Sequence, residues 1–250
     1  MNPPEIPESP WTDRALAVLD CESTGVDTQT ARIVQLAFVR VLPDGTIDEA
    51  HSPCTLVNPG VDIPAEATAV HGITDDQVRA PGVPTTATAL AAFAYRLGSF
   101  WAAGDCVAVM NAPYDIPLVE SEWARCARDG ILPVWPPVLD PLVLDRHLDR
   151  YRKGRRNLAA LCQHYGVPLS EAHDARADAI ATARVLLAIA ARYPSIAHLT
   201  PQDVHARQVQ WHRTWRDGVN GYWARRGDPR RATEEWPGLR GAATAASGDG

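Results

Sequence analysis

An apolar stretch that ends in two acidic residues most constrains how this chain can fold. Residues 15–26 read ALAVLDCESTGV, with Asp20 and Glu22 two positions apart. Side chains alternate across a strand, so these two carboxylates share one face and Cys21 points to the other. Carboxylates on one face repel, and burial strengthens the repulsion. A divalent cation would offset it, and ligation by oxygen alone suits Mg²⁺ or Mn²⁺; the alternative is a pair of solvated loop acids.

Composition bounds the class of protein. The chain has 250 residues, is 46% hydrophobic and carries a formal net charge of −6. That length supplies one substantial core. The acidic balance argues against a basic protein that coats duplexes non-specifically, but a nuclease whose acidic site is neutralised by metal remains compatible with it. The cysteines are scattered and form no C-x-x-C pair, which favours free thiols and a cytoplasmic location over a disulfide framework.

The ends of the chain differ from its middle. Residues 1–12 are rich in proline and acidic, and residues 241–250 are small and polar, so we expect a disordered lead-in and a disordered tail. The first residues lack the apolar segment of a signal peptide, and no apolar run is long enough to cross a membrane. We expect a main domain over 13–195 and a helical extension over 196–240.

Hydrophobic periodicity predicts strands first, then alternating strands and helices, then helices. The expected strands are 15–21, 32–41, 46–57, 106–111 and 137–140, with the first three forming an antiparallel meander. The expected helices are 85–104, 113–130, 141–151, 156–165 and 174–192. This order indicates an α/β fold in which a mixed sheet is flanked by helices.

Two further segments place acids next to apolar elements. In VAVMNAPYD, an apolar strand ends at Asn111, and Asp115 follows in the first turn of a helix, where an acid is also favoured by the helix dipole alone. In HDARADAIATA, Asp178 lies in an alanine-rich helix, with His173 five residues earlier. That spacing separates the two by about 140° on a helix, so His173 must lie before the helix if both serve one site. Asp174 is then the expected N-cap.

LDCESTG, MNAPYD and HDARADAIATA together resemble the three motifs of the DEDD superfamily of 3′-5′ exonucleases, in the subgroup with a histidine. The chain is similar to the proofreading epsilon subunits of bacterial DNA polymerase III and their stand-alone relatives over about residues 13–193. The resemblance implies a ribonuclease-H-like fold with a mixed five-stranded sheet. Ser23 replaces a threonine common in the first motif, and Met110 replaces a histidine common in the second.

The resemblance also implies an activity. It points to hydrolysis of single-stranded DNA from its 3′ end into 5′-mononucleotides, with two Mg²⁺ or Mn²⁺ ions. The catalytic residues would be Asp20, Glu22, Asp115, His173 and Asp178, the four acids as metal ligands and the histidine as general base. By the same resemblance, Ser23, Thr24, His71 and Asn111 would contact the terminal nucleotide. Two alternatives remain: an RNA-trimming exonuclease of the ribonuclease T or oligoribonuclease type, and a non-catalytic nucleic-acid-binding module.

The extension has its own pattern. Residues 204–231 hold seven arginines and two acids, and Val204, Gln208, Trp211, Trp215, Val219 and Tyr222 follow helical spacing. Three interpretations stay open: the stripe covers the domain's own core, it binds single-stranded nucleic acid through arginines and aromatic rings, or it docks a protein partner.

Overall fold

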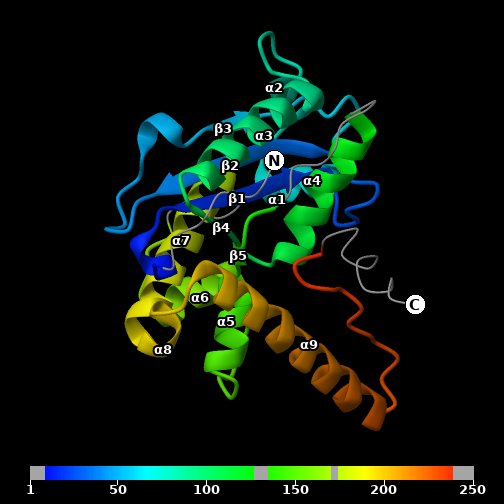
Figure 1. The fold of residues 1–250 in the computed structure, drawn as a ribbon. Helices are drawn as coiled ribbons and strands as arrows, with labels where there is room; N and C mark the ends of the chain where they lie inside the picture. The colour runs from blue at the N-terminus through cyan, green and yellow to red at the C-terminus, as the bar shows by residue number, and fades with distance from the viewer. Residues whose placement is uncertain (1–8, 127–134, 170–173, 239–250) are drawn as a thin grey trace, which may run out of the picture.

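The computed structural model describes residues 9–126, 135–169 and 174–238. Its centre is a mixed five-stranded sheet (Figure 1). The spatial order is β3 (Cys54–Leu56), β2 (Ile33–Val41), β1 (Leu16–Ser23), β4 (Cys106–Val109) and β5 (Val138–Leu139). β1–β2 and β2–β3 are antiparallel, whereas β4 runs parallel to both β1 and β5. The expected mixed sheet with an antiparallel meander is confirmed.

Helices cover both faces of the sheet (Figure 1). In chain order they are α1 (Ala65–His71), α2 (Asp75–Val78), α3 (Thr86–Ala102), α4 (Ala112–Cys126), α5 (Pro141–Leu148), α6 (Leu158–Tyr165), α7 (Ala175–Arg192), α8 (Pro194–Ala197) and α9 (Pro201–Arg225). Among the described helices, none is long and apolar enough to span a bilayer.

β1 separates two hydrophobic cores, because its side chains alternate between the two faces of the sheet. Leu16 and Val18 pack into a core that α6 and α7 close. Ala17, Leu19 and Cys21 pack into the core beneath α3 and α4. Asp20 therefore continues the face of β1 that is covered by α7, beyond the last apolar residue on that side.

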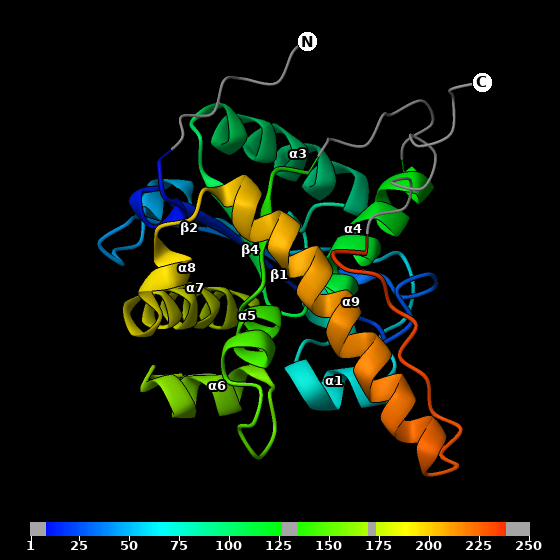
Figure 2. The ribbon, with the colours of Figure 1, turned by 60° about the horizontal axis from the view of Figure 1, so that its bottom comes forward.

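α9 closes the outer edge of the sheet beside β5, as both views show (Figures 1 and 2). The wholly buried Gln208 donates to the carbonyl of Val138 at 2.9 Å and accepts from the N–H of Asp140 at 2.8 Å. His205 accepts from the N–H of Val138. An edge strand otherwise exposes such groups unpaired, so these side chains replace the missing neighbouring strand.

Two expectations need correction. The third strand, expected over 46–57, is only Cys54–Leu56, preceded by a 3-10 turn at Glu49–His51. The cause is Ser52, whose hydroxyl accepts from the N–H of Arg40 and donates to the carbonyl of Asp48, so a side chain takes the place of the strand ladder there. Residues 9–12, expected in a disordered lead-in, are packed instead. Trp11 is fully buried and its indole N–H donates to the carbonyl of Ile196. Residues 1–8 and 239–250 lie outside the described residues.

Replacing Gln208 tests how α9 is held. Gln208→Leu keeps the size of the side chain but leaves the carbonyl of Val138 and the N–H of Asp140 without partners, which costs about 1–3 kcal/mol for each buried group. We expect the free energy of unfolding in urea to fall by at least the lower of these values. Gln210→Leu, at an exposed position of the same helix, is the control and should change it little. Equal effects of both variants would contradict the bridging role of Gln208.

Candidate active site

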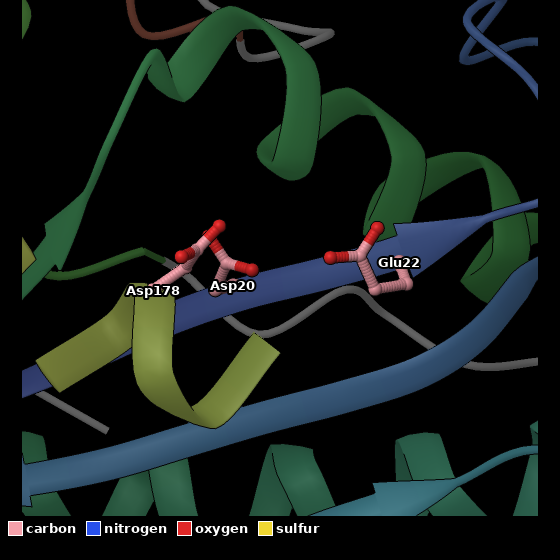
Figure 3. A group of neighbouring side chains, drawn as sticks. All are labelled: Asp20, Glu22 and Asp178. Atoms are coloured by element: carbon pink, nitrogen blue, oxygen red, sulfur yellow. The ribbon is translucent and has the colours of Figure 1, made fainter. Parts of the chain in front are cut away.

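Three carboxylates from two distant parts of the chain, β1 and α7, meet beside the C-terminal half of β1. Asp20, Glu22 and Asp178 each offer an oxygen atom, and these atoms all lie within 4.8 Å of one another. Asp20 and Glu22 project from the same side of β1, and Asp178 reaches them from the start of α7 (Figure 3). The same-face arrangement expected from their spacing is present.

Local hydrogen bonds fix the start of α7, and with it Asp178. Asp174 is the N-cap and its carboxylate accepts from the N–H of Ala177 at 3.0 Å, as the sequence predicts. The N–H of Ala175 donates to the side-chain oxygen of Gln35 on β2. The first turn of α7 is thus tied to the sheet one turn before Asp178. His173 lies outside the described residues.

Asp115 approaches β1 from α4. It is almost fully buried, and its Oδ1 accepts from the backbone N–H of Cys21 at 2.9 Å. Since Cys21 lies between Asp20 and Glu22 in the chain, this bond brings the fourth predicted acid against the strand that carries the first two. Asp115 is not one of the three residues whose oxygens converge most closely.

The carboxylates perturb one another. Burial, followed by the charges of Asp115 and Asp178, raises the pKa of Asp20 well above its ordinary value. Burial and the charge of Asp178 raise the pKa of Glu22 to about 8. Burial raises the pKa of Asp115 to about 7, although the N–H of Cys21 opposes the rise. The ionised cluster is therefore costly without a cation. Its oxygen-only donor set is of the kind that binds Mg²⁺ or Mn²⁺, and Asp20, Glu22 and Asp178 could supply the ligand atoms.

A pocket of about 410 Å³ opens next to the carboxylates, between the end of β1 and α1. Glu22, Ser23, Thr24 and His71 are among the residues that line it, so the structure brings three of the four predicted nucleotide contacts together. His71 ends α1, directly before Gly72 in the left-handed conformation. The exposed apolar side chains of Val26 and Val70 also line the pocket.

Asn111, the fourth predicted nucleotide contact, does not line that pocket. It has a positive φ of 61°, and its N–H donates to Asp140 at 3.1 Å. The neighbouring N–H of Ala112 donates to the other oxygen of Asp140. Asn111 therefore lies in the sharp turn between β4 and α4, where it shapes the start of the helix that carries Asp115.

Tyr114 is a pocket residue that the sequence reasoning missed. Its hydroxyl donates to the carbonyl of Gly25 at 2.8 Å and is hydrogen-bonded to the hydroxyl of Ser23. Burial raises its pKa to about 12, so the phenol stays a hydrogen-bond donor at neutral pH. The available signal was its position directly before Asp115, inside the second motif.

Comparison with known proteins identifies the family. The family model described as Exonuclease, named RNase T, matches residues 17–186. The chain belongs to the RNase T exonuclease family. It is also 34% identical over 185 residues to a DNA polymerase III subunit epsilon-like protein of Rhodobacter capsulatus, an alignment that covers 73% of this chain and 24% of that one. The chain thus spans about a quarter of this relative.

Solved structures share the fold. E. coli exonuclease I in complex with a dA16 oligonucleotide matches with a TM-score of 0.60 and 22% identity, over 73% of this chain and 42% of that one. Exonuclease X in complex with 5′ overhanging duplex DNA matches with a TM-score of 0.56 and 23% identity, over 76% of this chain and 99% of that one. These structures confirm the ribonuclease-H-like fold, and the family match with the epsilon-like relative confirms the predicted resemblance to exonucleases of this type.

The carboxylate cluster predicts a linked dependence of stability on pH and metal. A carboxyl whose pKa is raised by folding binds more protons in the folded state, so the metal-free protein loses stability as pH rises from about 4 towards 8. Added Mg²⁺ or Mn²⁺ should therefore raise the melting temperature more at pH 8 than at pH 5.

Glu22→Gln should flatten the pH dependence of the metal-free protein, because the neutral amide removes the group whose pKa is about 8. Melting curves in EDTA across this pH range measure the effect. Asp76→Asn, which changes an exposed carboxylate on α2, is the matched control. If the melting temperature of Glu22→Gln depended on pH as that of the parent does, the raised pKa of Glu22 would be contradicted.

Proposed function

We propose that this protein is a metal-dependent 3′-5′ exonuclease that degrades single-stranded DNA from its 3′ end and releases 5′-mononucleotides. The observation that carries the proposal is the convergence of Asp20, Glu22 and Asp178 beside a pocket that holds Ser23, Thr24 and His71. Membership of an exonuclease family and similarity to an epsilon-like protein support the reaction class. The exonuclease I complex with dA16 supports a single-stranded DNA substrate.

The residues have distinct roles in this proposal. Asp20, Glu22 and Asp178, together with Asp115, would hold the cations. Two divalent ions supply Lewis-acid stabilisation of charge on the phosphate and on the leaving 3′-oxygen. His173 is the general base that accepts a proton from the attacking water. Those five residues are the catalytic set of the histidine subgroup.

The pocket holds the terminal nucleotide in the same proposal. Ser23 and Thr24 line it, and their hydroxyls would hydrogen-bond the terminal sugar. The side chains of Val26 and Val70 offer apolar contact to the base. Tyr114 holds the Ser23 hydroxyl and the Gly25 carbonyl in place, so it shapes the pocket from the side of α4.

A gel assay tests the reaction, its polarity and its substrate. Matched 5′-labelled single-stranded DNA and RNA are incubated with the full chain and Mn²⁺. We expect a ladder that shortens from the 3′ end of DNA and is absent with Asp20→Asn or Asp178→Ala. Turnover at the parent rate in either variant would refute the site. Shortening of RNA alone would favour the RNA-trimming alternative, and binding of either strand without shortening would favour the non-catalytic module.

His173→Ala tests the general base separately. Loss of general-base catalysis typically lowers turnover ~10²–10⁴-fold, while Mn²⁺ binding measured by calorimetry should persist. His198→Ala, at an exposed position after α8, is the control and should retain parent turnover. Full turnover in His173→Ala would remove this residue from the mechanism.

A further inference from the structure

A second hollow lies between α5 and α9, outside the carboxylate site. It encloses about 510 Å³ and is lined by the last turn of α5, the segment after it and the C-terminal half of α9. The two helices pack side by side (Figure 2). α9 begins after the last residue that the family model matches, so this groove contains a wall that the family match does not account for.

The charged side chains that line the groove are all basic. They are Arg146, Arg150 and Arg156; the neighbouring His147 is neutral at pH 7, because burial lowers its pKa. The chain as a whole has a net charge of −6, so the positive charge of this groove is opposite in sign to that of the whole protein. A positively charged groove is complementary to a polyanion. Arg156 is already paired with the buried Asp145 and serves the fold.

Arg146 and Arg150 have no such pairing within the described residues. The Arg146 guanidinium lies 3.6 Å from the centre of the Trp215 ring, and that of Arg150 lies 5.8 Å from the ring of Tyr151. The contact with Trp215 orients the Arg146 guanidinium but satisfies none of its N–H donors. The Arg146 guanidinium is partly buried and carries a desolvation cost that a bound phosphate would offset, whereas Arg150 is exposed at the groove.

Aromatic rings alternate with the arginines. His147 stacks on Trp211 with ring centres 4.0 Å apart and an angle of 11° between their planes. Tyr222 lines the groove and is 49% exposed, so part of its ring is open to a ligand. Cationic side chains interleaved with aromatic rings are the usual composition of surfaces that bind single strands, where phosphates meet the charges and bases stack on the rings.

We propose that the α5–α9 groove binds the backbone of single-stranded DNA at nucleotides upstream of the 3′ end. This inference rests on the proposed function, because the bound strand is the substrate of the carboxylate site. α5 packs against α7, which carries Asp178, and against α9. α5 thus forms one side of the groove and also contacts the helix that carries Asp178. The groove sets the affinity for long strands, whereas very short substrates reach only the carboxylate site.

Equilibrium binding measures this directly. Fluorescence anisotropy of labelled dT20 is recorded with the full chain carrying Asp20→Asn, over a range of salt concentrations. Arg146→Ala/Arg150→Ala should weaken binding roughly tenfold or more. It should also lower the slope of log affinity against log salt by about 1.4, since each single-strand phosphate contact contributes about 0.7.

Two further variants distinguish binding in the groove from a general effect of positive charge and from loss of folding. Gly218 lines the groove, and a Cβ there would meet open space, so Gly218→Phe fills the groove while retaining every arginine. It should weaken dT20 binding without lowering the melting temperature. Arg213→Ala removes an exposed arginine of α9 that does not line the groove, and it should leave affinity within about twofold.

Hydrolysis of dT3 by otherwise unaltered protein distinguishes this inference from the proposed function. We expect the groove variants to retain dT3 turnover and lose efficiency on dT20. Unchanged dT20 affinity in both groove variants would overturn the inference and favour a protein partner for this face. A loss of dT20 affinity in Arg213→Ala equal to that in the groove variants would also overturn it. Absence of hydrolysis in every protein, with groove-dependent dT20 binding retained, would refute the proposed function alone.

Discussion

The wholly buried carboxylate of Asp140 joins the parts of the molecule that surround the site. It accepts from the N–H groups of Asn111, Ala112 and Leu142 and from the indole of Trp236. Burial raises the pKa of Asp140, and these four donors oppose the rise. One side chain thereby starts α4, starts α5 and anchors the segment after α9. A buried charge is tolerated only where several donors compensate its desolvation, and four do so here.

Asp140 also governs the position of Asp115. The turn it holds begins α4, and Asp115 in the first turn of α4 accepts from the N–H of Cys21. Hydrogen bonds at both ends of the first turn of α4 thus connect the C-terminal segment with the strand that bears Asp20 and Glu22. The carboxylate cluster opposes folding through like-charge repulsion, so the surrounding contacts must hold it in place until a cation offsets that repulsion.

Local sequence signals predict the mixed sheet, apart from the length of its third strand, and the shared face of Asp20 and Glu22, whereas the meeting of Asp178 with them is implied by the family resemblance. Alternation along β1 placed Asp20 and Glu22 on one face, and the N-cap at Asp174 set the phase of α7, so that Asp178 falls in its first turn. Contacts between distant segments carried no such signal. The bridge from Gln208 to Val138 and Asp140 spans about seventy residues and depends on tertiary packing alone. Trp11 was missed for the same reason, since its partner is Ile196.

The stripe along α9 shows why periodicity alone could not choose among the three interpretations of the extension. Val204 and Gln208 are fully buried against the domain, and Trp211 packs partly on both cores. Further along the same stripe, Trp215 and Tyr222 leave the core and line the groove. One amphipathic face thus performs two tasks, because the helix is longer than the sheet it covers. Its first half is fixed by the core, and in our proposal this positions its second half to bind the DNA strand.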